Sequence, residues 1–119
     1  MKKTVMILGT EYTIETHKMS EDKFLEDNNY AGYCAEEAKR IIIADMSEEK
    51  YFDLDKNEQE IYRKRVLRHE IIHAFLNESG LSADASTPAG AWAKHEEMVD
   101  WIAIQFPKIA AVYQELGIM

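Results

Sequence analysis

The sequence has one cysteine, few basic residues and no long apolar run, and each of these shortages excludes a class of protein. Cys34 has no partner for a disulfide within the chain, which excludes the disulfide-stabilised scaffolds of small secreted proteins. The apolar run nearest the N-terminus, residues 5–8, is too short for the core of a signal peptide or for a membrane span. We therefore expect a cytoplasmic protein.

Basic residues are scarce relative to acidic ones. Fourteen lysines and arginines stand against 22 aspartates and glutamates, so the net charge is −8. That charge repels phosphate backbones and anionic membranes, so we expect neither nucleic acid nor a membrane as a partner. The 119 residues are 46% hydrophobic, which is enough for one domain, residues 1–119, with a modest core and a shallow substrate cleft.

The N-terminal third has the composition of β-strands. Residues 4–17 are rich in β-branched side chains around a central glycine, which predicts a β-hairpin. Within residues 30–45, the three consecutive isoleucines at 41–43 predict a buried strand and residues 32–35 its hairpin partner, although a helix over 35–40 is the alternative. Together these segments predict a mainly antiparallel sheet of about four strands. Its edge strand would suit the addition of an extended peptide.

Two smaller expectations concern the residues around these strands. Ser20 precedes an acidic and apolar stretch, so we expect it to be the N-cap of a short helix that ends near residues 28–29. His17, at the end of the hairpin, is expected on the surface and not at a metal, because no second donor stands at metal-ligand spacing from it.

The second half of the chain predicts helices, which makes the fold α+β. Asp55 and Glu58 have capping-box spacing and no glycine or proline follows until Gly80, so we expect a long helix over residues 56–79. Residues 80–90 predict a loop that can border an active site. Two C-terminal helices are expected, over residues 91–105 with tryptophans in the core and over residues 108–117 with Pro107 at its start.

The long helix carries His69-Glu70-Ile71-Ile72-His73, an HExxH motif. Positions four apart lie on one helix face, so His69 and His73 can direct two imidazole nitrogens at one metal ion. Glu70 lies about 100° round the helix, where its carboxylate suits work on a metal-bound water better than ligation. Burial of two histidines and a glutamate near a core is unfavourable in free energy if their polar atoms have no partner. A zinc ion would be such a partner.

Catalytic zinc usually takes three protein ligands, so we expect the third from the next helix. That helix offers His95, Glu96 and Glu97. Glu96 is the preferred ligand, because Asp100 follows one turn later and its carboxylate can hydrogen-bond the far nitrogen of a ligating histidine. Glu97 remains the open alternative.

A helix with HExxH followed by a helix with ExxxD resembles the gluzincin metallopeptidases, and the short chain with a sheet before the motif looks like a small ImmA/IrrE-like zincin of the kind encoded in prophages. The resemblance covers residues 68–77 and 96–101. It implies that His69, His73 and Glu96 bind Zn²⁺ and that Glu70 is the general base. It also implies that Asp100 hydrogen-bonds the nitrogen of a ligating histidine that does not bind the metal. The metzincin continuation of the motif is absent, because Leu76 and Ser79 occupy its glycine and histidine positions.

The function expected from these residues is zinc-dependent hydrolysis of a peptide bond. Glu70 would take a proton from a zinc-activated water and pass it to the leaving nitrogen of a protein or peptide substrate, with a regulatory protein as one candidate. Tyr30, Tyr33 and His95 are candidates to stabilise the oxyanion, although packing is the commoner role of such residues. Two alternatives remain: a zinc-stabilised interaction module of phage origin without turnover, and a metal-free helical binding protein.

Overall fold

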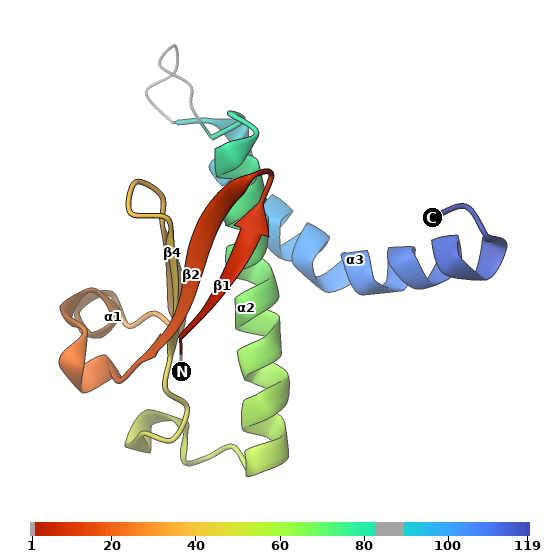
Figure 1. Ribbon diagram of the computed structural model, residues 1–119. Coiled ribbons are helices and arrows are strands. Elements are labelled where there is room, and N and C mark those ends of the chain that lie inside the picture. Colours follow the sequence, from red (N-terminus) through yellow and green to blue (C-terminus); the bar gives the residue numbers. More distant parts are fainter. Residues whose placement is uncertain (1, 83–89) are drawn as a thin grey trace.

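The computed structural model describes residues 2–82 and 90–119 and shows an α+β fold (Figure 1). A four-stranded sheet packs against one long helix, and a second long helix crosses the first and then extends away from the sheet. The strands are β1 (Lys2–Ile7), β2 (Thr10–His17), β3 (Gly32–Ala35) and β4 (Arg40–Ala44), and the α-helices are α1 (Lys23–Asn28), α2 (Lys56–Glu78) and α3 (Glu96–Leu116).

The sheet is mixed, with the strand order β1-β2-β4-β3. Both predicted hairpins are confirmed, since β1 pairs with β2 and β3 with β4 in antiparallel register. The first hairpin turns at Leu8 and Gly9, which have φ values of 48° and 86°. The prediction of a mainly antiparallel sheet holds for these outer pairs, but the central pair, β2 and β4, is parallel. The long connection from β2 through α1 and β3 allows this crossover.

The core lies between the sheet and α2. Three consecutive residues of β4, Ile41, Ile42 and Ile43, have exposed fractions of 1% or less, because both faces of this strand are covered. Gly32 of β3 allows α2 to approach closely, since a Cβ atom there would lie 2.8 Å from Cγ1 of Val66. The chain therefore brings the edge strand β3 directly against the helix that carries the HExxH motif.

The N-cap of helix α1 is Asp22, so the prediction that Ser20 is the N-cap is wrong. The Asp22 carboxylate accepts hydrogen bonds from the backbone N–H groups of Phe24 and Leu25. The hydroxyl of Ser20 instead donates to Glu48, 3.0 Å away. A carboxylate is a stronger acceptor than a hydroxyl for the unpaired N–H groups of a first turn, and its charge is favourable there.

Helix α2 has the predicted ends. The carboxylate of Asp55 accepts from the Glu58 N–H at 2.8 Å and the Glu58 side chain accepts from the Asp55 N–H at 3.1 Å, which confirms the capping box. At the other end the Glu78 carboxylate accepts from the hydroxyls of Thr10 and Tyr12 and from the ammonium of Lys39. Both ends of α2 are therefore held, and the motif in its second half has a fixed position over the sheet.

The prediction of two C-terminal helices is wrong, because α3 runs from Glu96 to Leu116 with Pro107 inside it. A 3-10 turn, Trp92–Lys94, precedes it. Proline removes one backbone hydrogen bond and its ring crowds the preceding turn, which favours a bend as well as a break. Figure 1 shows α3 changing direction and extending away from the sheet. No residue from 106 to 119 is buried, so no packing opposes that bend.

The tryptophans predicted in the core lie at the surface. Trp92 and Trp101 have exposed fractions of 63% and 59%, so this prediction is wrong. Helix α3 instead packs through Val99 and Ala103, which lie four residues apart on the same face and are buried. Among the residues that the structure describes, no helix is long and apolar enough to cross a membrane.

Candidate metal centre

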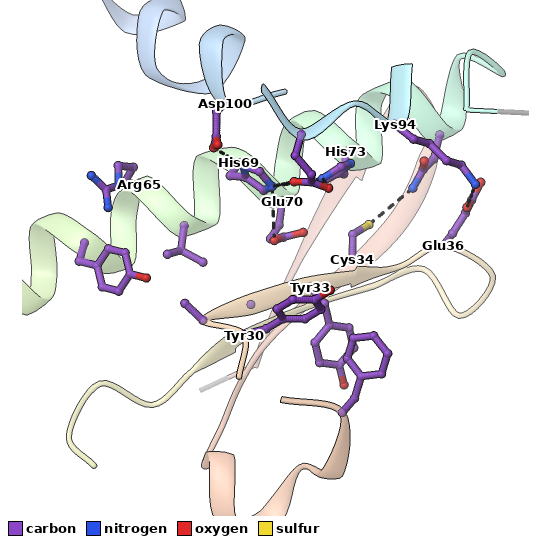
Figure 2. Close-up of a pocket in the computed structure, with 17 residues that line it drawn as sticks. Tyr30, Tyr33, Cys34, Glu36, Arg65, His69, Glu70, His73, Lys94 and Asp100 are labelled. Carbon is purple, nitrogen blue, oxygen red and sulfur yellow. Dashed lines mark hydrogen bonds and ion pairs between the residues drawn. The ribbon is translucent and has the colours of Figure 1, made fainter. Parts of the chain in front are cut away.

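Helix α2 places His69 and His73 one turn apart, with their side chains turned to the same side (Figure 2). The two Nε2 atoms lie 3.1 Å apart and the ring centroids 4.8 Å apart. Both side chains are mostly buried, with exposed fractions of 17% and 16%. The two nitrogens are thus directed at one point beside the helix, as the four-residue spacing predicts.

The first turn of α3 brings Glu96 to the same point. One of its carboxylate oxygens lies 2.9 Å from Nε2 of His69 and the other lies 3.2 Å from Nε2 of His73. Within residues 2–82 and 90–119, Glu97 makes no ion pair with either histidine, and its side chain is exposed. Of the two glutamates that the sequence left open as a third ligand, the structure therefore brings Glu96 to the histidines.

These three side chains fit a zinc ion. Ligand atoms at tetrahedral zinc, each about 2.0–2.1 Å from the metal, lie about 3.3 Å from one another. The two Nε2 atoms are 3.1 Å apart, and each lies 2.9 or 3.2 Å from a different oxygen of Glu96, which is close to that value. Two imidazole nitrogens and one carboxylate are also a donor set that catalytic zinc sites use. The side chains converge from two helices that pack on each other, so the site does not depend on one flexible segment.

Asp100 lies on the next turn of α3, beside the ring nitrogen of His69 that points away from Glu96. Its Oδ1 atom lies 2.7 Å from Nδ1 of His69, on the side of the ring opposite Nε2. A hydrogen bond at this position fixes the ring orientation and leaves Nε2 with its lone pair free for a metal. Glu96 and Asp100 are four residues apart, so one face of α3 supplies both contacts to His69.

Glu70 is buried beside the histidines, with an exposed fraction of 6%. Burial raises the pKa of its carboxyl to about 7, with His69 opposing the rise and Glu96 and Asp100 adding to it. The donor atoms of His69, Glu70 and His73 all lie within 4.8 Å of one another, so Glu70 is an alternative third ligand on proximity alone. Its oxygen is 3.9 Å from Nε2 of His69, however, whereas the Glu96 oxygens are 2.9 and 3.2 Å from the histidines. Glu70 is therefore better placed to reach a water beside the metal.

His73 has an imidazole pKa below its usual value. Burial lowers this pKa and the neighbouring His69 lowers it further, whereas Glu96 opposes the change. A neutral imidazole has a free lone pair, whereas a protonated one has none.

The centre lies in a cleft between α2, the edge strand β3 and the segment leading into α3. At one end Lys94 and Glu36 form an ion pair of 3.8 Å across the cleft. Cys34 lines the floor, where burial raises the pKa of its thiol to about 12. Neither Lys94 nor Glu36 was predicted in the site, because no local pattern shows that a turn between strands faces the start of a distant helix.

Comparisons of the chain with protein-family models, curated proteins and solved structures found no match. Its function is therefore inferred from the residues of the site and their geometry.

The three candidates for oxyanion stabilisation have different surroundings. Tyr33 donates its hydroxyl to Asp22 at 2.9 Å, so that donor is already engaged. Tyr30 lines the cleft and is about half exposed. His95 is the residue before α3 and is not among the residues that line the cleft. Residues 83–89 of the loop predicted to border the site lie outside the described residues.

His17 is half-buried in a polar cluster of its own, so its predicted place on the surface is wrong. Its Nδ1 atom lies 2.7 Å from Asp22 and its Nε2 atom lies 3.1 Å from Glu15. Glu15 in turn accepts two hydrogen bonds from the guanidinium of Arg40. This cluster joins β2, α1 and β4 and is separate from the candidate metal centre.

Proposed function

We propose that this protein is a zinc-dependent metallopeptidase that hydrolyses a peptide bond in a protein or peptide substrate. The observation that carries the proposal is the position of Glu96, whose two oxygens lie 2.9 and 3.2 Å from the Nε2 atoms of His69 and His73. The resemblance to small prophage-type ImmA/IrrE-like gluzincins supports the same function. We place its action in the cytoplasm, where a regulatory protein is a candidate substrate.

The metal ligands in this proposal are His69, His73 and Glu96, and Asp100 orients His69. Bound there, zinc would lower the pKa of a coordinated water and polarise the scissile carbonyl group. Two observations support this fit: the separations among the three donor groups, and the hydrogen bond between Nδ1 of His69 and Asp100. Histidine ligands of zinc commonly make such a hydrogen bond with their other ring nitrogen.

Glu70 is the general base in this proposal. Its carboxylate takes a proton from the attacking water and then delivers it to the leaving nitrogen as the C–N bond breaks. Burial at the floor of the cleft keeps it from other hydrogen-bond partners, since no side-chain hydrogen bond to Glu70 occurs in the described part of the chain. A purely structural zinc site would instead need a fourth ligand in place of this neighbouring carboxylate.

The test is metal content and peptide cleavage measured on the same samples. Purified protein should carry about one zinc per chain, and His73→Ala and Glu96→Ala should lose it while Glu97→Ala, the matched control, keeps it. Glu70→Gln should keep the zinc and lose cleavage of a peptide library. Zinc binding without cleavage by the native chain would favour the interaction module, and a native chain that takes up no zinc would reject the proposal.

A further inference from the structure

Three aromatic rings form a cluster beside the candidate metal centre. The ring centroid of Phe24 lies 5.8 Å from that of Tyr30 and 4.7 Å from that of Tyr33, with tilted planes in both pairs. Phe24 and Tyr30 have exposed fractions of 50% and 46%. We call these three residues the aromatic cluster. All three line the same cleft as His69, Glu70 and His73.

The aromatic cluster and the metal centre lie on opposite sides of β3. Gly32 and Cys34 face α2, since a Cβ atom at Gly32 would contact Val66 and the thiol of Cys34 lies 3.7 Å from the amide of Asn77. Tyr33, between them, points to the other side and reaches Asp22. Figure 2 shows Tyr30 and Tyr33 across the strand from Glu70.

Strand β3 is an edge of the sheet. It pairs with β4 on one side, and no other strand in the described part of the chain pairs with its free side. The cleft lies along that free side and is lined from both faces of the strand. An extended chain that pairs with an edge strand sends alternate side chains to the two faces of the sheet. Here one face leads to the metal centre and the other to the aromatic cluster.

We propose that the aromatic cluster is a specificity site that binds a large apolar side chain of an extended protein segment added to β3. The next residue of that segment then faces the side of β3 where His69 and Glu70 lie. That the bound segment is cleaved rests on the proposed function. The aromatic cluster indicates which class of substrate the site would accept. That class is an extended, unstructured segment with a large apolar side chain next to a residue that faces the candidate metal centre.

Asp22 holds two parts of the aromatic cluster, Tyr33 and the helix that carries Phe24. Asp22 accepts the hydroxyl of Tyr33 at 2.9 Å and the N–H groups that begin α1, the helix that carries Phe24. A rigid aromatic surface loses little conformational entropy on binding, which favours affinity for an apolar side chain.

Packing within the chain does not account for the exposure of this cluster. Tyr12, a core residue, is fully buried, whereas Phe24 and Tyr30, which line the cleft, are about half exposed. The cluster is also continuous with the site where cleavage is proposed, and its side chains carry no charge. An apolar side chain is therefore the chemistry that it fits.

The experiment measures peptide binding without cleavage. Random peptides displayed on phage are selected on the zinc-treated Glu70→Gln chain, and the recovered peptides are synthesised and their affinities measured. The same affinities are measured with Phe24→Ala and with Tyr30→Ala in that background. Phe52→Ala is the matched control, because Phe52 has an exposed fraction of 69% and does not line the cleft. Circular dichroism and zinc content are recorded for every variant.

The expected peptides share one large apolar position, and they lose about tenfold in affinity with Phe24→Ala or Tyr30→Ala but not with Phe52→Ala. N-methylation of the peptide backbone at alternate residues should also abolish binding, since it removes the donors that pair with β3. Recovery of no peptide, of peptides without such a position, or of peptides that bind all variants equally would overturn the inference. Failure of the proposed function appears separately, as absent zinc or absent cleavage by the native chain.

Discussion

Oδ1 of Asp100 lies 2.7 Å from Nδ1 of His69, and this contact joins the second turn of α3 to the middle of α2. It is shorter than either contact of Glu96 with the histidines, and it acts on a ring whose other nitrogen faces Glu96. Because Asp100 is exposed, its removal tests the orientation of His69 with little effect on the core.

Asp100→Ala should weaken zinc binding about 10- to 100-fold, because His69 loses the partner that orients its ring. The measurement is competition with a chelator of known affinity, followed by the zinc content of the protein. Glu97→Ala, on the same helix but without an ion pair to either histidine, is the control and should bind zinc as the native chain does. Equal affinities of the two variants would show that Asp100 does not support the site.

The polar cluster around His17 should make stability depend on pH. Burial opposes the charged imidazole, but Asp22 and Glu15 outweigh it and raise the pKa of His17 in the folded chain. Its contribution is therefore complete below the unfolded pKa, about 6.5, and is lost as the pH rises through the higher folded pKa. Urea unfolding should show that the native chain is more stable than His17→Gln at about pH 6, and that this difference shrinks as the pH rises above about 6.5.

Glu15 gives the opposite dependence in acid. The hydrogen bonds from Arg40 outweigh burial and, with those from His17 and Thr13, hold the pKa of the Glu15 carboxyl well below its usual range. Its stabilising contribution is complete above about pH 4.3 and is lost as the pH falls toward the folded pKa. The difference in free energy of unfolding between the native chain and Glu15→Gln should thus shrink below about pH 4. A constant difference would contradict the role of the Arg40 pair.

Gly32→Ala should destabilise the fold by about 1–3 kcal/mol, because the added methyl group has no space. Its Cβ atom would lie 2.8 Å from Cγ1 of Val66 and 2.9 Å from the backbone oxygen of Ile42, and the backbone contact cannot be relieved by a side-chain rotation. The measurement is urea unfolding. A second variant, Gly32→Ala with Val66→Ala, should recover only part of the loss. Full recovery would show that the backbone contact is unimportant.

Truncation of the chain after Phe106 should leave zinc binding and the unfolding midpoint nearly unchanged. None of the residues removed is buried, and the proposed metal ligands and Asp100 precede the cut. Val99→Ala is the contrasting variant, since Val99 is fully buried where α3 packs, and it should cost about 1–3 kcal/mol. A truncated chain that unfolds as readily as the Val99 variant would show that the end of α3 has a packing partner.

Local patterns in the sequence predicted the elements that local forces determine. The capping box of Asp55 and Glu58, the two hairpins and the length of α2 each depend on residues within a few positions of one another. The four-residue spacing of His69 and His73 likewise places both on one side of a helix, whatever that helix packs against.

The predictions for Pro107 and Trp101 are wrong because each depended on packing between distant segments, or on its absence. Pro107 predicted a helix end, but the helix continues past it where nothing opposes a bend. Trp101 was expected in the core because of its apolar character, yet the face of α3 that meets α2 is that of Val99 and Ala103. The error for His17 is local, since Glu15 of the same strand and Asp22, the N-cap of α1, both lie within five residues of it in the chain.

By itself the sequence determined that His69 and His73 lie on one side of a helix with Glu70 beside them. In an α-helix the spacing of these residues along the chain determines their relative positions, whatever the helix packs against. Only the tertiary structure decided between Glu96 and Glu97, because the angle at which α3 crosses α2 determines which carboxylate reaches the histidines. The same holds for the cleft, since the distance between β3 and α2 depends on the contact of Gly32 with Val66, two residues that lie far apart in the chain.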